Sequence, residues 1–156
     1  MLKKLEQLSL SVEGRYATER ELQFIKDYLP SIDLRMSAYE KIRDAEAEMI
    51  KQLQNKMRQL KPDIFKTKSG DITAVCQRDI KVILRNAIAA MLINDLDRVR
   101  ENILLWQRII IRVFKERHIA TMVHTTMPEI IEQYLTPDEF ALVNPALQLN
   151  QAILAD

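Results

Sequence analysis

Apolar residues recur at helical spacing along nearly the whole chain. In the first segment the repeat consists of Leu2, Leu5, Leu8 and Val12. It predicts a short amphipathic helix over 2–12. Thr18 and Glu21 follow at the spacing of a capping box, in which each side chain accepts a hydrogen bond from the other residue's backbone N–H. A second helix is therefore predicted to run through Leu29 and to stop at Pro30.

The segment 31–61 contains neither Gly nor Pro, and its apolar stripe is formed by Tyr39, Ile42, Met49, Ile50, Leu53, Met57 and Leu60. The stripe is poorest at 44–48, so it predicts either one long helix or two helices with a bend. Lys61-Pro62-Asp63 ends the pattern, because the residue before a proline disfavours helix. A polar loop over 66–71 is then expected to lead into an apolar helix over 72–93.

The next helix is expected to start at Asp97 as its cap and to run to about Arg117. Its predicted inner face consists of Val99, Ile103, Trp106, Ile110, Val113 and Phe114. The spacing of these six residues is that of one face of an α-helix. Residues 118–120 are expected to lead from this helix into a short connector.

Two further helix starts are predicted near the C-terminus. Thr126 and Glu129, with Pro128 in the first turn, give the first. The run Thr136-Pro137-Asp138-Glu139 gives the second. Pro145 is expected to kink or split this last helix, because proline lacks an N–H and clashes with the preceding turn. Seven or eight helices around one core are therefore predicted.

Composition narrows the fold class to all-α. The 156 residues are 47% hydrophobic and 29% charged, which is typical of a globular protein. This length predicts a single domain over 1–156 that can bury a proper core. The chain has only two glycines. Tight hairpins and phosphate-binding loops both rely on glycine at positive φ, so neither is expected.

Charge and hydropathy exclude several classes of partner. The longest apolar run, 87–93, is far shorter than the ~20 residues of a spanning helix. The N-terminus lacks the continuous apolar core of a secretory signal, so a cytoplasm-like compartment is expected. The formal net charge is +1 with the signs interspersed, which gives no field for nucleic acid. We interpret the arginines between 98 and 112 as a solvated helix face.

The candidate chemistry lies in the segment 73–85, which holds the only cysteine. At 100° per residue one helix face collects Cys76, Ile80, Ile83, Leu84, Ala87 and Met91. Asp79 lies one turn from Cys76 on nearly that face, and Arg78 precedes it. A carboxylate taken from water needs a partner or a ligand with N–H donors. Considered alone, Cys76 has the pattern of a small core residue.

Four matched segments in one order carry a resemblance to a known family. Cys76-x-Arg78-Asp79, followed by Leu84-Arg85 and an apolar helix ending at Asp95, resembles the chromophore helix of the phycobiliproteins, and most of all that of allophycocyanin. The three upstream matches are an opening segment formed by Arg15-Tyr16, Thr18-x-x-Glu21-Leu22 and Ile25-Lys26, then Ile50-Lys51-Gln52, and then Pro62-Asp63. The likeness covers roughly residues 13 to 100.

The resemblance implies a globin-like helical body with residues 1–29 as a two-helix extension that binds a partner subunit. It also implies a phycocyanobilin-like linear tetrapyrrole attached to Cys76 by a thioether. Asp79 matches the aspartate that accepts hydrogen bonds from the pyrrole N–H groups, and Arg78 matches the arginine that pairs with a propionate. The expected function is light absorption or energy transfer without turnover, at the cytoplasmic (stromal) face of thylakoid membranes.

The chain also departs from the family pattern around this motif. A Tyr-Tyr pair is replaced by Val82-Ile83, and a tyrosine and a glycine further on are replaced by Ala89 and Asn94. The segment from Pro62 to Cys76 is several residues shorter than in the family. The last helix has Ala146-Leu147-Gln148-Leu149 in place of a Tyr-Phe-Asp-Tyr run. These changes suggest a divergent relative with an exposed or unusual bilin.

Other candidate residues change the picture little. His118 and His124 are expected in a polar surface connector, which argues against haem. Trp106 is expected in the core, or else as a ring that faces the pigment. The carboxylates show no metal-ligand spacing and no nucleophile with a paired base, so no enzyme activity is predicted.

Two functions therefore remain open. The first is a bilin-binding, allophycocyanin-like protein that associates with itself, with other phycobiliproteins, or with phycobilisome core or photosystem components. The second is a pigment-free protein of the same fold that acts in assembly or regulation of the antenna or photosystems. The intact Cys76-x-Arg78-Asp79 motif favours the first, and the shortened segment before Cys76 and the lost tyrosines favour the second.

Overall fold

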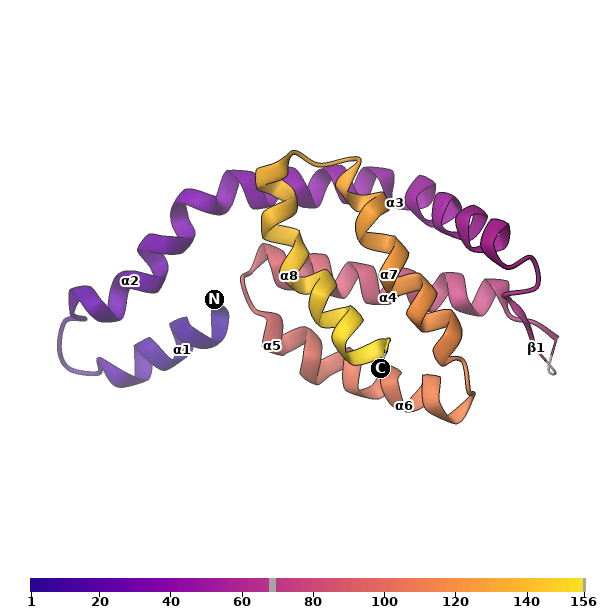
Figure 1. Cartoon of the computed structure of the whole chain (residues 1–156). Coiled ribbons are helices and arrows are strands. Elements are labelled where there is room, and N and C mark those ends of the chain that lie inside the picture. The colour runs from indigo at the N-terminus through magenta and orange to yellow at the C-terminus, as the bar shows by residue number, and fades with distance from the viewer. Residues whose placement is uncertain (68–69, 156) are drawn as a thin grey trace.

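The structure is a computed structural model that describes residues 1–67 and 70–155, and its described part is almost wholly helical (Figure 1). The elements, in chain order, are α1 (Leu2–Ser11), α2 (Glu19–Tyr28), a 3-10 turn (Leu29–Ser31), α3 (Ile32–Leu60), β1 (Lys66–Thr67), β2 (Gly70–Asp71), α4 (Thr73–Leu92), α5 (Leu96–Val99), a π-helical turn (Arg100–Leu104), α6 (Leu105–Val113), α7 (Arg117–Glu132) and α8 (Pro137–Leu154).

The first two helices begin as the sequence predicts, and α2 ends at Tyr28, one residue before the predicted end at Leu29. Thr18 and Glu21 form the predicted capping box at the start of α2. Pro30 lies in the first turn of the 3-10 segment, where its missing N–H has no helical role, and the chain passes directly into α3. Of the two alternatives for 31–61, one helix of 29 residues is correct.

The expected polar loop over 66–71 contains a two-residue antiparallel ladder. Lys66 pairs with Asp71 and Thr67 with Gly70. Gly70 has φ 114, a conformation open to glycine and strained for other residues, which allows the chain to return beside itself. The tip of the predicted loop, 68–69, lies outside the described residues. The absence of tight hairpins was therefore wrongly predicted, because one of the two glycines is enough to form this short hairpin between α3 and α4.

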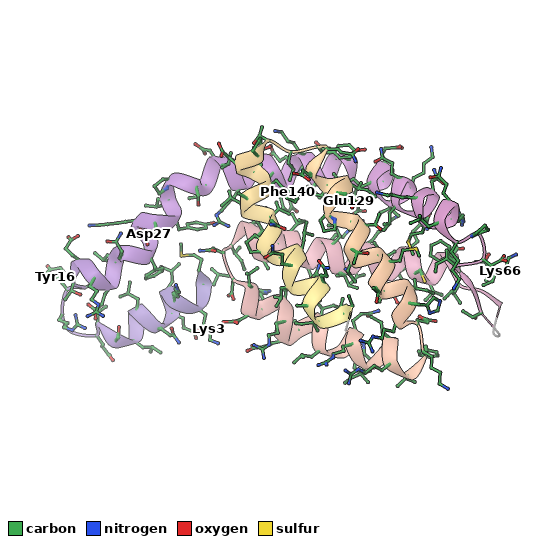
Figure 2. All side chains as sticks on the ribbon, viewed as in Figure 1. Lys3, Tyr16, Asp27, Lys66, Glu129 and Phe140 are labelled. Atoms are coloured by element: carbon green, nitrogen blue, oxygen red, sulfur yellow. The ribbon has the colours of Figure 1, made fainter. Side chains whose placement is uncertain are left out.

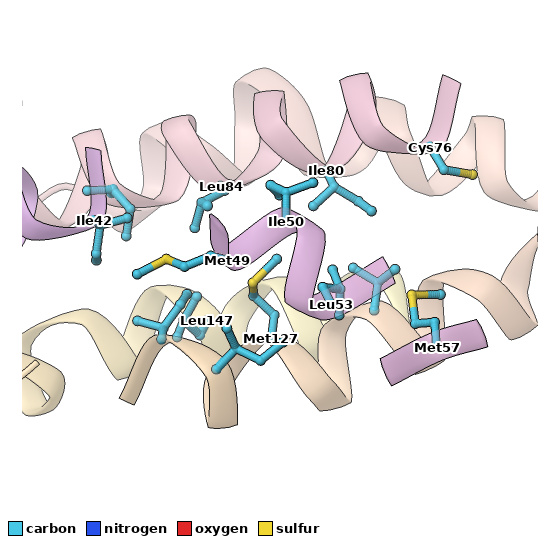
Figure 3. Close-up of a cluster of buried hydrophobic side chains, with 14 of the residues drawn as sticks. Ile42, Met49, Ile50, Leu53, Met57, Cys76, Ile80, Leu84, Met127 and Leu147 are labelled. Atoms are coloured by element: carbon cyan, nitrogen blue, oxygen red, sulfur yellow. The ribbon is translucent and has the colours of Figure 1, made fainter. Parts of the chain in front are cut away.

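The main core lies between α3, α4, α7 and α8. Helix α4 packs against α3 and α8, and α7 packs against the same two helices. Figure 3 shows Ile42, Met49, Ile50, Leu53 and Met57 of α3 meeting Ile80 and Leu84 of α4, Met127 of α7 and Leu147 of α8. At about 25 cal/mol per Å² of apolar area, burial of such side chains is the main stabilising contribution to the fold.

Helices α1 and α2 project from this body as an antiparallel pair, and neither helix has a buried residue. Figure 2 shows Tyr16 at the tip of the turn between them, away from the body. Two hydrogen bonds tie the pair to the end of α4. The Tyr28 hydroxyl donates to the Leu92 carbonyl at 2.7 Å, and the Met1 amino group donates to the Asn94 carbonyl at 2.9 Å.

The predicted inner face of the segment 97–117 is wrong beyond its first turn. Trp106, Val113 and Phe114 are 60%, 67% and 65% exposed, while Val99, Leu104 and Ile111 are buried. The π-helical turn at 100–104 is the cause, because its wider turn displaces the following residues by about one position around the helix axis. The cap also lies two residues earlier than predicted, at Asp95 instead of Asp97, since the Asp95 side chain accepts from the Arg98 N–H at 3.3 Å.

The predicted connector at 118–120 is wrong as well, because these residues lie in α7. Ile119 and Ala120 are buried there, and α7 is continuous through Thr126 and Pro128. Packing of this apolar face against α3 and α8 outweighs the local stop and start signals. Similarly, α8 is one helix through Pro145 and is not split.

Candidate functional site

A cleft with a volume of about 1010 Å³ opens beside the first half of α4. It lies between β1, α4, α6 and the turn that joins α6 to α7, and we call it the α4–α6 cleft. Its apolar wall is made by Ile72 and Val75 from the α4 side and by Trp106, Ile110 and Phe114 from the α6 side. The exposed aromatic rings of α6 are therefore part of a concave surface, as small-molecule sites usually are.

The predicted residues Arg78 and Asp79 both line this cleft and bind each other. Arg78 donates to Asp79 Oδ1 from Nε at 3.0 Å and lies within 2.9 Å of it through Nη2. Asp79 Oδ2 accepts from Gln107 Nε2 at 3.4 Å. The Arg78 side chain is 70% exposed and that of Asp79 is 26% exposed. The arginine of this pair is therefore largely exposed to water, and the aspartate is partly shielded from it.

Cys76 lies in α4 at the end of a row of core side chains, beyond Leu84 and Ile80 (Figure 3). It is buried and lines a second, narrow space of about 40 Å³, which we call the thiol pocket. Asp79, Gln107 and Glu116 line both the α4–α6 cleft and the thiol pocket, so they stand between the two. The cysteine is thus adjacent to the cleft without being part of its wall.

The surroundings of Cys76 disfavour the thiolate. Burial raises the pKa of the Cys76 thiol to about 11, and the negative charges of Glu116, Asp79 and Asp71 act in the same direction. Because the thiolate is the nucleophile, a thiol with this pKa is unreactive at neutral pH. In the structure as it stands, Cys76 resembles a core residue more than an activated nucleophile.

Glu116 was not singled out by the sequence, yet it lies at the junction of the two spaces. Burial and the nearby Asp79 raise the pKa of its carboxyl group, and His118 acts weakly in the opposite direction. Neither Glu116 nor Gln107 forms a sequence motif with Cys76. Gln107 lies in α6 and Glu116 precedes α7, whereas Cys76 lies in α4. No pattern in the sequence therefore indicates that these two residues lie near Cys76.

The positions at which the chain departs from the phycobiliprotein pattern have distinct structural roles. Ile83 is buried on the thiol pocket, whereas Val82 is 38% exposed. Ala89 lines a separate groove between α3 and α4. Asn94 has φ 50 in the turn after α4, where the Asp95 N–H donates to the Ala90 carbonyl at 2.9 Å. A left-handed residue is required there, and asparagine is the next best choice after glycine.

The two histidines lie in different environments. His118 is exposed on the rim of the α4–α6 cleft, as expected. The prediction for His124 was wrong, because this side chain is buried in α7, and burial lowers its pKa to about 4. Among residues 1–67 and 70–155, no group of three or more His, Cys, Asp or Glu side chains could hold a metal ion.

Comparison with known proteins gives one family. The sequence model described as phycobilisome protein matches residues 8–152. No curated protein matches the sequence. Together with the helical structure, the family match confirms the predicted all-α, globin-like fold. In the described part of the chain, none of the helices has the length and apolar character needed to cross a membrane.

Proposed function

Because the chain belongs to the phycobilisome protein family, we propose that it binds a linear tetrapyrrole in the α4–α6 cleft and serves light absorption or energy transfer. The observation that carries the proposal is the convergence of an apolar wall with Arg78 and Asp79 in one cleft. Its volume of about 1010 Å³ is at the upper end of the usual range of ~300–1,000 Å³ for small-molecule sites. A flat, extended pigment fits such a space.

The residues present suit the chemistry of this pigment. Trp106 and Phe114 offer faces and edges for the conjugated rings, and Arg78 offers a planar fork for a propionate. If Arg78 turns to the propionate, Asp79 becomes available to the pyrrole N–H groups. When bound, the pigment supplies the absorbing π-system. The protein holds it extended and excludes water from its inner edge.

We further propose that the pigment is attached through Cys76, as the motif implies. The sulfur would add to a vinyl-type carbon, and the thiol proton would end on the neighbouring carbon, so that no oxidant or reductant is required. The thiol pocket, at about 40 Å³, holds only a few water molecules and cannot admit a pyrrole ring. Attachment therefore requires Cys76 to turn toward the cleft, and we expect it to be slow.

The burial of Cys76, which raises the pKa of its thiol, supports the pigment-free alternative together with the sequence departures described above. On this alternative the exposed aromatic wall of α6 binds a protein in assembly or regulation of the antenna or photosystems. In either case we propose no catalytic activity. As partners we propose a second copy of this chain, other phycobiliprotein subunits, or phycobilisome core or photosystem components. We propose that residues 1–29 form the binding surface and that the protein acts at the cytoplasmic (stromal) face of thylakoid membranes.

The deciding experiment is to produce the chain together with a linear tetrapyrrole and to record its absorbance spectrum. Denaturation in acidic urea and zinc-stained gel fluorescence then distinguish covalent from non-covalent pigment. We expect a pigmented band for the wild-type chain, and for Cys76→Ala a folded protein without covalent pigment. Covalent pigment on Cys76→Ala would overturn the attachment site. A colourless wild-type chain that remains folded would overturn pigment binding and favour the alternative.

A further inference from the structure

One carboxylate on the wall of the α4–α6 cleft has no partner. The side chain of Glu116 is half-buried and makes no hydrogen bond or ion pair with any residue in the described part of the chain. It lines both the cleft and the thiol pocket together with Asp79, and its charge contributes to the raised pKa of the Cys76 thiol. It also occupies the N-cap position of α7 but makes no capping bond. Its position therefore serves no evident structural purpose.

The backbone holds Glu116 in this position at a cost. The N–H of Glu116 donates to the Ile111 carbonyl at 2.9 Å and that of Lys115 to the Arg112 carbonyl at 3.2 Å, which is the Schellman pattern. The turn requires a left-handed residue, and Lys115 supplies it with φ 59 instead of the usual glycine. A side chain in that region costs roughly 1–2 kcal/mol. The turn returns the chain sharply enough to place Glu116 over the thiol pocket.

A second carboxylate, that of Glu139, has hydrogen-bond donors and serves as a comparison. Glu139 is only 2% exposed. It accepts from the Lys41 amino group at 2.7 and 2.8 Å and from the Ser37 hydroxyl at 2.6 Å. Burial acts to raise its pKa, but these bonds together with those from Thr136 lower the pKa to about 2. Glu116 is shifted in the opposite direction because burial and Asp79 are not offset by any donor.

The missing donor defines the chemistry of a ligand. Asp79 already accepts from Arg78 and Gln107, so Glu116 is the carboxylate in the cleft that stands ready to accept. If Arg78 turns away, two neighbouring carboxylates are left without a cation. A ligand that brings several N–H donors and a positive charge to the inner edge of the cleft would give Glu116 its missing donor. It would also replace Arg78 as the cation beside Asp79.

We propose that Glu116 accepts hydrogen bonds from the inner N–H groups of the bound tetrapyrrole and keeps the pigment in its protonated, cationic form. This inference rests on the proposed function. Asp79 then acts as the second acceptor, on the opposite helix. The other charged or titratable groups that line the cleft or the thiol pocket with Glu116 are Arg78 and Cys76 from α4, Lys66 from β1, Lys115 from the turn, and His118 and His124 from α7.

The test compares the full chain with Glu116→Gln and with the matched control Glu132→Gln, an exposed glutamate on α7 outside the cleft. Biliverdin serves as the probe. The first readout is the pH at which the long-wavelength absorbance of the bound pigment is lost, which reports its deprotonation. The second is the dissociation constant. The third, measured without pigment, is the pH dependence of the urea unfolding midpoint.

In Glu116→Gln we expect deprotonation of the bound pigment at least one pH unit lower and binding about tenfold weaker, the effect of one charge-assisted hydrogen bond. Without pigment, this variant should match or exceed the wild-type stability at neutral pH. The reason is that a raised carboxyl pKa contributes stability only below its unfolded value, and this contribution is lost as the pH rises through the folded value. Glu132→Gln should leave all three readouts unchanged.

The outcomes separate this inference from the proposed function. If the wild-type chain binds biliverdin and Glu116→Gln shows the wild-type pH profile and affinity, the role of Glu116 is wrong while pigment binding stands. If the folded wild-type chain binds no tetrapyrrole, both are overturned. If Glu116→Gln is less stable than wild type without pigment, Glu116 has a structural role, and the inference is also overturned.

Discussion

The stability of this chain should fall between pH 7 and pH 5 because of one histidine. His124 is 7% exposed, and its imidazole makes no hydrogen bond or ion pair with the described residues. Burial lowers its pKa to about 4, whereas a histidine in an unfolded chain titrates near ~6.5. Between these two pKa values, the histidine is therefore protonated in the unfolded state and neutral in the folded state. Stability is complete above the unfolded pKa and is lost as the pH falls toward 4.

The magnitude follows from these two values. Proton linkage gives a loss of about 2 kcal/mol in the free energy of unfolding between pH 7 and pH 5. For a chain of this length that corresponds to a decrease of roughly 4–8 °C in Tm. The assay is urea unfolding followed by far-ultraviolet circular dichroism at pH 7, 6 and 5, for the wild type, His124→Gln and His118→Gln. His118 is the matched control because it is exposed and is the second of the two histidines.

The informative quantity is the slope of stability against pH and not its absolute value. His124→Gln leaves a buried amide without a partner and should be less stable at every pH, but its slope over this interval should be nearly flat. His124→Met, which suits the apolar surroundings, provides a second variant if the amide prevents folding. A wild-type slope in both variants, or a flat slope in His118→Gln, would refute the reasoning.

Three further predictions concern the cleft, the turn and the extension. Trp106 is the only tryptophan and is 60% exposed, so its emission should be that of a solvated indole and should be quenched when biliverdin enters the cleft; unchanged emission on binding would place the ligand elsewhere. Lys115→Gly should be more stable than Lys115→Ala by about 1 kcal/mol in urea unfolding, because only glycine relieves the left-handed strain; equal stabilities would contradict that strain. Leu10, on α1, is 71% exposed, so Leu10→Ser should shift sedimentation toward smaller species if residues 1–29 bind a partner subunit, whereas the neighbouring polar change Glu6→Gln should not; identical sedimentation for both would count against this surface.

Periodicity predicted well wherever a helix was uninterrupted. All six residues assigned to the inner face of the cysteine helix are buried, from Cys76 to Met91, because α4 is regular over its 20 residues. The capping boxes at Thr18 and Thr136 were also found, since they depend only on neighbours three residues apart. In both cases the information lies within one element.

Periodicity failed where geometry depended on contacts between elements. The π-helical turn at 100–104 has no local sequence signature, so periodicity placed Trp106 on the inner face of its helix, although its ring is exposed and lines the cleft. Thr126 and Pro128 carry the signals of a helix start, but α7 continues through both because its apolar face is covered by α3 and α8. As a result, the burial of His124 could not be predicted.

The same distinction explains which part of the candidate site the sequence could identify. Cys76, Arg78 and Asp79 follow one another on a single helix, so their spacing alone relates them. Glu116 reaches them only because the π-helical turn rotates α6 and the strained turn at Lys115 then reverses the chain. The strained turn costs stability and places a carboxylate where it has no partner among the described residues. A regular turn with glycine would avoid this cost, so the arrangement is better explained by a bound ligand than by the fold.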